Sequence, residues 1–388
     1  MGQPGEVERV FVQCLPGLEG VLEIEAGSLG RVKRVAGGVE LEGPPGVHAQ
    51  AVLVLRVAER VLLRLIETPV RRWSDVERYL QSVTLEGLAA PGGRVMIELT
   101  VRTSGAPAGA VLPGRLARLW GRPVSRASGD DREGGVPRLV LRVAEGVAAL
   151  SADVGGTLLH RRGWRQEVSR APLRETLAAG VLVLSGHRTD RPVWDPVCGS
   201  GTLVIEAALV ARGVAPGLGR SFAAERWPEA ARVDWAGRRE RLRAQVRAHA
   251  RAPIVGTDLN AGALGTARRN ARRAGVLEEL RLERLDVSNV APGLLTPGLI
   301  VGNLPYGLRV GVRHGLEVFD TSLATTLRGR FGTWRWALLV DDPDRLLRAG
   351  GRAPDQVHRL VNGGIPVVLG VWDPEGTPKV FDTFDPGV

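Results

Sequence analysis

Short apolar segments that alternate with helical patterns constrain the fold of this chain most strongly. Beyond about residue 170, five such segments are each bounded by turn-forming residues: Val193–Val197, Ile254–Leu259, Leu280–Asp286, Leu299–Asn303 and Trp336–Val340. Helical patterns lie between several of them, for example at Ala261–Ala274. This order is typical of a parallel β-sheet covered by helices on both faces. The segments Val357–Leu360 and Ile365–Trp372 flank Asn-Gly-Gly and predict an antiparallel hairpin at the sheet edge.

The first 155 residues predict a separate, mixed α+β module. Their apolar patterns predict helices at Leu18–Leu29, Ala51–Leu65 and Leu112–Leu119, and strands at Val10–Gln13, Val95–Val101 and Leu139–Val143. The segment Val32–Leu41 predicts a hairpin that turns at Gly37-Gly38. Because domains usually hold about 100–200 residues, a chain of 388 residues should contain two or three of them.

The balance of charges indicates a polyanionic partner. The chain has 52 Lys and Arg against 42 Asp and Glu, a net charge of +10, and such an excess favours nucleic acid. Since Lys33 and Lys379 are the only lysines, codon usage is an alternative source of the arginines. Residues 1–150 carry 19 basic and 17 acidic residues, so most of the excess lies in the remainder.

Several other features limit where the protein works. No apolar run reaches the roughly 18 residues of a membrane span, and the first residues lack the pattern of a secretory signal. Two cysteines, Cys14 and Cys198, cannot build a disulfide framework, which favours a reducing cytoplasm. The six histidines do not pair with cysteines or acids at metal-ligand spacing, so we expect no metal. The lack of a long apolar run predicts that the membrane is not a partner either.

The clearest local motif is a glycine-rich turn between a predicted strand and a predicted helix. It comprises Asp195, Pro196, Val197, Cys198, Gly199, Ser200, Gly201 and Thr202. Gly199 and Gly201 permit a tight turn and close approach of a ligand, and the free N–H groups of the helix start attract an anionic or carboxylate-bearing ligand. A plain strand-to-helix turn is the alternative. Cys198 suits packing better than nucleophilic catalysis, because no histidine is near it in the sequence.

Acidic residues end the next two predicted strands. Asp258 follows the second strand and Asp286 the third. An acid at the end of the second strand of a Rossmann-like sheet binds ribose hydroxyls. Asp286 is placed to accept from an adenine amine, although each acid alone is also a common helix N-cap. Three acids at successive strand ends favour a nucleoside-containing cofactor along that edge.

The fourth strand runs into the tetrapeptide Asn303, Leu304, Pro305 and Tyr306. Here the chain resembles amino-methyltransferases, which carry Asn/Asp-Pro-Pro-aromatic at this place. The Asn303 side-chain oxygen and the Leu304 carbonyl would hold the protons of an exocyclic amine, and Tyr306 would stack on the extruded base. Leu304 departs from the family's first proline, so the rigidity of that residue is lost. A simple Asn-x-Pro turn is the alternative.

With these motifs, the whole chain resembles the THUMP-domain guanine-N2 methyltransferases of the bacterial 23S rRNA type, in their single-methyltransferase form. Further similar segments are Pro16–Glu19, His160–Arg165, Ala171–Ala179, Ile205–Ala208, Ala215–Arg220, Phe222–Trp227 and Asn270–Gly275. The resemblance implies a Rossmann-like class I methyltransferase domain that uses S-adenosylmethionine, preceded by a ferredoxin-like and THUMP module that binds RNA. It places the ferredoxin-like part at 1–45, the THUMP domain at 46–155, and the linker with the methyltransferase domain at 156–388.

The resemblance also assigns roles to the linker. Pro172 and Thr176 would lie near the methionine end of the cofactor. Arg161, Arg162, Arg165 and Arg170 would contact RNA phosphates, with an ordinary solvated basic turn as the alternative. The implied substrate is a guanosine of 23S rRNA, with tRNA as the near variant. Apart from the resemblance, the basic, self-contained design of the chain suits a cytoplasmic monomer. A DNA adenine-N6 methyltransferase and a non-catalytic RNA-binding factor are the rival functions.

Overall fold

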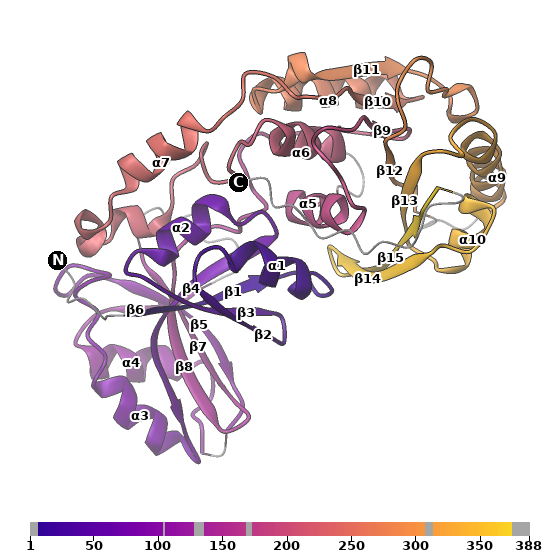
Figure 1. Ribbon diagram of the computed structural model, residues 1–388. Coiled ribbons are helices and arrows are strands. Elements are labelled where there is room, and N and C mark those ends of the chain that lie inside the picture. The colour runs from indigo at the N-terminus through magenta and orange to yellow at the C-terminus, as the bar shows by residue number, and fades with distance from the viewer. Residues whose placement is uncertain (1–6, 104, 128–135, 168–172, 307–312, 375–388) are drawn as a thin grey trace. The chain divides into compact units, whose positions relative to one another are not determined.

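The computed structural model describes residues 7–103, 105–127, 136–167, 173–306 and 313–374 (Figure 1). They belong to two compact units, each described here by itself. The first contains the chain up to Cys14 together with Leu22–Leu159 and Gly219–Arg241. The second contains Leu15–Val21, His160–Leu218 and the residues from Leu242 onward. Leu15–Val21 therefore packs with the second unit, although the residues on both sides of it belong to the first. In the same way, Gly219–Arg241 packs with the first unit, although the residues on both sides of it belong to the second.

In the described part of the first unit, eight strands form one sheet in the order β2-β3-β1-β4-β8-β7-β5-β6. Their bounds are β1 Glu8–Cys14, β2 Arg31–Val35, β3 Gly38–Gly43, β4 Ala58–Pro69, β5 Val95–Val101, β6 Val124–Arg126, β7 Arg138–Ala144 and β8 Val147–Asp153. Neighbours run antiparallel except β5, which is parallel to both β6 and β7. The predicted hairpin at Val32–Leu41 is confirmed by the β2–β3 pairing.

The helices in this part of the chain are α1 Glu19–Ala26, α2 Val47–Val54, α3 Trp73–Gln81 and α4 Leu112–Trp120. The predicted helix at Ala51–Leu65 is wrong, because α2 ends at Val54 and the chain enters β4 at Ala58. α2 packs against β1 and β4, and α3 packs against α4.

Residues 219–241 add an aromatic cluster to the first unit. They include the short 3-10 helices η1 Ala223–Arg226 and η2 Pro228–Arg232 and most of α7 Trp235–Ala244. Trp227 and Trp235 lie 6.3 and 6.2 Å from the ring of His48, measured between ring centroids. In α7, Arg238 donates to Gln50, and Arg239 donates to Glu225. These two arginines of α7 therefore make hydrogen bonds within the first unit.

In the described part of the second unit, seven strands form a sheet in the order β11-β10-β9-β12-β13-β15-β14. Their bounds are β9 Val193–Asp195, β10 Ile254–Asp258, β11 Leu280–Arg284, β12 Leu299–Asn303, β13 Arg335–Val340, β14 Gln356–Asn362 and β15 Ile365–Trp372. The first five run parallel, and β15 is antiparallel to both β13 and β14. This confirms the predicted parallel sheet with its antiparallel hairpin at one edge. The strand order reverses between β9 and β12, the place where open α/β sheets bind ligands.

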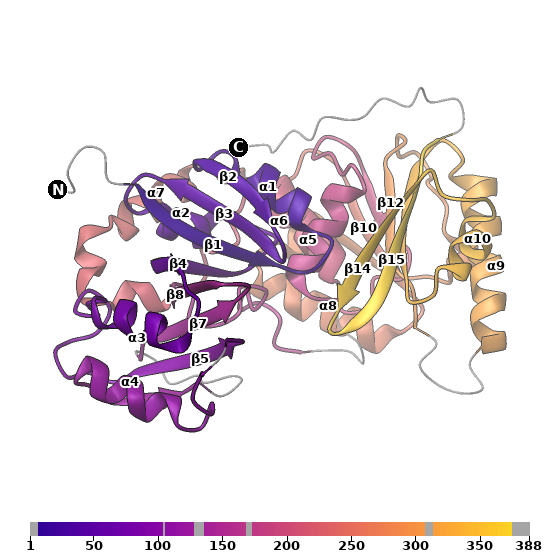
Figure 2. The same ribbon diagram turned by 90° about the horizontal axis from the view of Figure 1, so that it is seen from below.

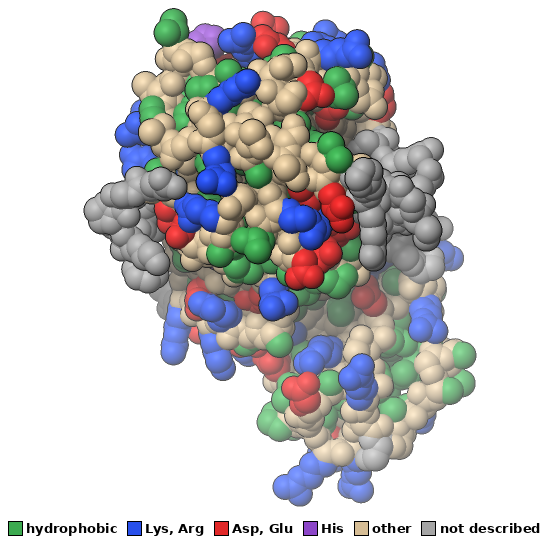
Figure 3. All heavy atoms as spheres, turned by 90° about the vertical axis from the view of Figure 1, so that its right-hand side faces the viewer, with side chains coloured by type: hydrophobic (Ala, Val, Ile, Leu, Met, Phe, Trp, Pro, Cys, Tyr) green, Lys and Arg blue, Asp and Glu red, His purple; other side chains and the backbone are tan. Residues whose placement is uncertain are grey.

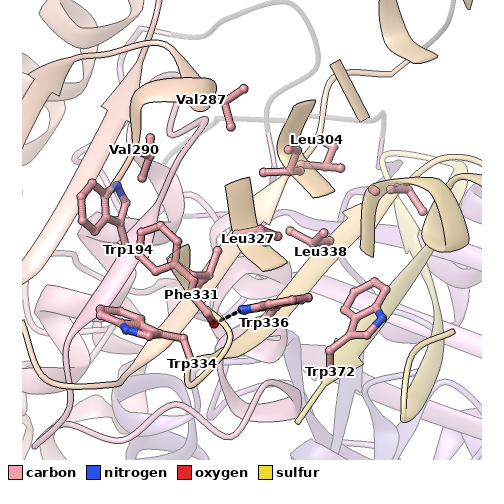
Figure 4. Close-up of a cluster of buried hydrophobic side chains, with 14 of the residues drawn as sticks. Trp194, Val287, Val290, Leu304, Leu327, Phe331, Trp334, Trp336, Leu338 and Trp372 are labelled. Carbon is pink, nitrogen blue, oxygen red and sulfur yellow. Dashed lines mark hydrogen bonds between the residues drawn. The ribbon is translucent and has the colours of Figure 1, made fainter. Parts of the chain in front are cut away.

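Helices cover both faces of this sheet (Figures 1 and 2). α5 Glu175–Leu184, α6 Thr202–Ala211 and α8 Ala261–Arg273 lie on one face, and α9 Arg313–Arg330 and α10 Asp344–Gly350 lie on the other. The short 3-10 helices η3 Leu277–Glu279 and η4 Val287–Asn289 flank β11. An apolar cluster between the sheet and α9–α10 includes Trp194, Phe331 and Trp336, and Trp336 Nε1 donates to the Phe331 carbonyl at 2.9 Å (Figure 4).

Candidate active site

The predicted cofactor loop connects β9 to α6 at the switch point of the sheet. Gly201 is the N-cap of α6 with φ of +86°. A Cβ atom on Gly201 would lie 3.0 Å from the Cβ of Ala267 in α8, so this glycine is needed for close helix packing. Gly199 instead lines a cavity at the carboxyl ends of the strands. The loop therefore joins a helix start with free N–H groups to a backbone that a ligand can approach.

A cavity of about 350 Å³ opens along the carboxyl ends of these strands. The predicted residues that line it are Asp195, Pro196, Cys198, Gly199, Ser200, Thr202, Asp258, Asp286, Asn303, Leu304, Pro305 and Tyr306. Apolar walls come from Val197 of the predicted turn and from residues outside the predicted set: Leu173, Leu203, Leu259, Leu285, Val287 and Phe319. Leu259, Leu285 and Val287 adjoin a predicted acid in the sequence, whereas Phe319 lies on α9 and gave no local signal. The fold thus brings most of the proposed cofactor residues and the tetrapeptide into one cavity, whereas Gly201 serves helix packing and does not line it.

The Asp258 carboxylate is tied to the loop that it faces. Its oxygens accept from the backbone N–H groups of Gly199 and Asn260, both at 2.8 Å. Asn260, and not Asp258, caps α8, because its side chain accepts from Gly262 and Ala263. The N-cap alternative for Asp258 is therefore excluded.

Asp286 does act as a cap, although it also lines the cavity. Its carboxylate accepts from the Ser288 hydroxyl at 2.6 Å and from the Ser288 N–H at 2.8 Å at the start of η4. These hydrogen bonds hold the pKa of Asp286 below its ordinary value. A charged carboxylate that is fixed in this way has oxygen lone pairs left for a ligand amine.

Two groups of the loop are buried. Burial raises the pKa of Asp195 to about 8, and the nearby Asp258 charge adds to the shift. The Asp195 carboxylate accepts a hydrogen bond from the Val197 N–H at 3.0 Å. Burial also raises the pKa of the Cys198 thiol well above its ordinary value, which disfavours a nucleophilic thiolate and supports the packing interpretation.

The tetrapeptide is held at the end of β12 by its own side chains. The Tyr306 hydroxyl donates to Asn303 Oδ1 at 2.7 Å and accepts from Asn362 Nδ2 at 3.3 Å. Burial raises the pKa of Tyr306 to about 12, so the hydroxyl stays protonated at neutral pH. The Leu304 side chain is fully buried in the apolar cluster (Figure 4). Leucine at this position therefore anchors the tetrapeptide in the core, where the family carries proline.

Two of the proposed phosphate contacts are corrected by the structure. Arg162 lies with its Nε 3.2 Å from Glu206 Oε1, and the two side chains are 2% and 0% exposed. Arg165 donates to Glu175 at 2.7 Å and to the Leu173 carbonyl at 2.7 Å. Arginines buried against carboxylates cannot reach an RNA backbone, so both stabilise the linker inside the second unit.

The remaining linker residues have varied places. Arg161 is exposed, and Thr176 is fully buried in α5 and does not line the cavity. Pro172 and Arg170 lie outside the described residues. Leu173, next to Pro172, does line the cavity, so the linker runs beside the proposed cofactor site.

Three further features of the described residues bear on partners. They contain no group of three or more His, Cys, Asp or Glu side chains that is placed to hold a metal ion. None of the described helices combines the length and the apolar character that a membrane span requires. On the face drawn in Figure 3, Lys and Arg side chains are interspersed with Asp and Glu and do not gather into one basic patch.

Comparison with known families agrees with this geometry. A model of the RMKL-like methyltransferase domain matches residues 162–369, which is more than half of the chain. The chain belongs to the RMKL-like methyltransferase family. A model of the RlmL ferredoxin-like domain also matches residues 9–62. This RMKL-like protein is therefore an S-adenosylmethionine-dependent methyltransferase with a ferredoxin-like module ahead of its Rossmann-like domain.

Solved structures share the fold over almost the whole chain. SMU.472, described as a methyltransferase and solved with SAH, is 24% identical with a TM-score of 0.80, over 96% of this chain and 100% of its own. A Listeria monocytogenes protein described as a predicted N6-adenine-specific DNA methylase is 24% identical with a TM-score of 0.82, over 95% and 97%. TrmN from Thermus thermophilus is 22% identical with a TM-score of 0.68, over 95% and 99%. At these identities the likeness establishes the fold of the RMKL-like protein.

Proposed function

We propose that this RMKL-like enzyme methylates RNA and forms N2-methylguanosine, with 23S rRNA as its substrate. The observation that carries the proposal is the place of Asn303, which lies in the cavity that also holds Asp195, Asp258 and Asp286. An amide oxygen beside a methyl donor suits an exocyclic amine, which needs an acceptor for its protons more than it needs a strong base.

The residues of the cavity fit S-adenosylmethionine. Asp258 would accept from the ribose hydroxyls, Asp286 from the adenine amine, and the start of α6 would face the carboxylate of the methionine part. Apolar side chains such as Leu259 and Leu285 would pack beside the adenine ring. When bound, this cofactor supplies an electrophilic methyl group on a sulfonium centre.

The protein's part in the reaction is to orient the amine. Asn303 Oδ1 and the Leu304 carbonyl would accept hydrogen bonds from its two N–H groups and turn its lone pair toward the methyl carbon. As the new N–C bond forms and the S–C bond breaks, positive charge develops on the amine and is stabilised by the two oxygens. The proton then leaves to water, so the tetrapeptide needs no His, Asp or Glu as a base. The Tyr306 ring, which lines the cavity, would stack on the guanine.

Two observations favour RNA as the substrate. The module ahead of the methyltransferase domain matches the ferredoxin-like domain of RlmL, and the chain has a net charge of +10. The THUMP assignment of residues 46–155, the RNA contact of Arg161 and the domain bounds at 45 and 155 belong to the same proposal. The Listeria monocytogenes neighbour, described as a DNA adenine methylase, makes adenine-N6 methylation the second candidate.

Nucleoside mass spectrometry tests the proposal. Ribosomal RNA, tRNA and DNA would be prepared separately from cells with and without the gene. Loss of N2-methylguanosine from 23S rRNA is the expected result. Loss from tRNA alone would keep the chemistry and change the substrate, whereas loss of N6-methyladenine from DNA would overturn the proposal. No loss in any fraction would favour a non-catalytic role.

A further inference from the structure

An arginine far from the tetrapeptide in the sequence contacts its backbone. Arg345 lies in α10, is 3% exposed, and donates through Nη1 to the Pro305 carbonyl at 2.7 Å. Pro305 follows Leu304, whose carbonyl is the proposed second acceptor for the target amine. A single guanidinium therefore holds the peptide next to a proposed catalytic oxygen.

The other donors of Arg345 are bound to two carboxylates. Its Nε and Nη2 donate to the two oxygens of Asp320 in α9, at 3.0 and 2.8 Å, and Asp320 is fully buried. Its Nη1 also donates to Asp341, directly after β13, at 2.8 Å. Burying such charges is costly unless each finds partners, so the arrangement tolerates few alternative positions of the guanidinium. Arg345 thereby connects α9, the end of β13 and the tetrapeptide.

Leu304 itself is held by other contacts. The Leu304 N–H donates to the Leu339 carbonyl at 3.0 Å, and its side chain packs in the apolar cluster (Figure 4). A second proline at position 304 would fix the backbone dihedral φ and would lack this N–H. Leucine at position 304 keeps this hydrogen bond, and Arg345 holds the neighbouring Pro305 peptide.

We propose that Arg345 is a positioning residue for methyl transfer, which fixes the Pro305 peptide and so the orientation of the Leu304 carbonyl and the Tyr306 ring. Asp320 orients Arg345 for this task. The inference rests on the proposed function, because it assigns the Leu304 carbonyl to the target amine. The inference adds residues outside the tetrapeptide, because Asp320 lies on α9 and Arg345 on α10, and neither helix carries a motif of its own.

Three variants and one matched control test this role. Arg345→Lys keeps the charge but cannot reach Asp320 and Pro305 together, Arg345→Met removes both contacts, and Asp320→Asn weakens the bidentate pair. The control is Glu206→Gln, which disturbs the buried Arg162–Glu206 pair in the same unit and does not touch the tetrapeptide. The measurements are the single-turnover rate on RNA, the dissociation constant for SAH, thermal stability and hydrogen exchange of the peptide that covers Asn303–Tyr306.

The variants at Arg345 and Asp320 should lower the single-turnover rate by about 10-fold to 10²-fold, the scale of a small misplacement of reacting groups, with the affinity for SAH unchanged. The Leu304 amide should exchange faster in them. Glu206→Gln should lose stability while keeping the wild-type rate and wild-type exchange in this peptide. Arg345→Lys should recover part of the rate that Arg345→Met loses.

Unchanged exchange, or an unchanged rate in folded Arg345→Met, would overturn the inference. So would equal loss of rate in the Glu206→Gln control, since general destabilisation would then explain the effect. If the wild-type protein methylates no RNA, the proposed function fails instead, and the exchange data still decide whether Arg345 holds the tetrapeptide.

Discussion

The Tyr306 hydroxyl donates a hydrogen bond of 2.7 Å to the side-chain oxygen of Asn303, the atom proposed to accept a hydrogen bond from the target amine. The same hydroxyl accepts from Asn362 in the terminal hairpin. Because a hydroxyl has one hydrogen, accepting from Asn362 directs that hydrogen to Asn303. The Tyr306 ring and the Asn303 amide are thus held together, and the second lone pair of the Asn303 oxygen remains for the proposed substrate amine.

Asn303→Ala should lower the methylation rate by about 10²–10³-fold, the usual scale for the loss of one positioned polar group. Affinity for S-adenosylmethionine should be almost intact, because the cofactor loop and Asp258 are untouched. Single-turnover kinetics together with calorimetry would separate the two effects. Full activity in this variant would refute the proposed role of Asn303.

Two variants of Tyr306 separate the hydroxyl from the ring. Tyr306→Phe should reduce the rate by about 2-fold to 10-fold, because one hydrogen bond of about 0.5–1.5 kcal/mol no longer orients Asn303. Tyr306→Ala should cost considerably more, since the surface for stacking is lost as well. Both would be measured as the single-turnover rate at saturating RNA. A Phe variant that is as slow as the Ala variant would contradict a stacking role for the ring.

Because Asp258 is the proposed ribose acceptor and also accepts from the Gly199 N–H, its Ala and Asn variants should weaken cofactor binding to different extents. Asp258→Ala should raise the dissociation constant of S-adenosylmethionine, because the ribose acceptor is lost and the Gly199 N–H loses its partner at 2.8 Å. Asp258→Asn keeps one acceptor oxygen and should be milder. Calorimetry measures both, and wild-type affinity in Asp258→Ala would exclude the ribose assignment.

The sequence predicted the elements best where turns bound short apolar runs. The predicted strands Val95–Val101 and Leu299–Asn303 coincide with β5 and β12. Ala51–Leu65 failed because apolar residues continue through the junction between α2 and β4, and residues 55–57, Leu-Arg-Val, contain neither Gly nor Pro. A continuous apolar run does not reveal where a helix gives way to a strand.

Local sequence patterns likewise predicted residues that line the cavity, but they did not predict the buried ion pairs around it. Asp195, Asp258 and Asn303 could be found because they end strands of one sheet. The burial of Arg162 and Arg165 could not be predicted in this way, because each arginine pairs with a glutamate on a helix, Glu206 or Glu175. The same holds for Arg345 and Asp320, which only the packing of α10 on α9 brings together.

The raised pKa of Asp195 predicts that cofactor binding depends on pH. Because burial raises this pKa to about 8, the carboxyl group is mostly protonated at neutral pH. A cationic sulfonium in the same cavity favours the charged form, so binding should lower the pKa and release a proton. Affinity should therefore rise from about pH 6 to about pH 8 and level off above it.

Calorimetry in two buffers of different ionisation enthalpy would count the released proton. Asp195→Asn, which cannot ionise, should bind with an affinity that depends less on pH. A flat pH profile in the wild-type protein would contradict the release of a proton from Asp195 when the cofactor binds.

Gly17 predicts a stability effect in the second unit. It belongs to Leu15–Val21, which packs with that unit, and it has φ of +90°. A Cβ atom there would lie 2.2 Å from the Arg359 carbonyl oxygen of β14, so Gly17→Ala must both strain the backbone and displace the strand. We expect the free energy of unfolding to fall by about 2–4 kcal/mol.

Gly163 provides the matched control, because it lies in the same unit with φ of +91° and a Cβ atom there would meet nothing within 4 Å. Gly163→Ala should cost only the backbone term, about 1–2 kcal/mol. Urea unfolding of both variants, followed by tryptophan fluorescence, gives the difference that belongs to the close approach of Gly17 to β14. Equal losses would mean that the Arg359 backbone moves aside at little cost, and that residues 15–21 pack only loosely against the hairpin.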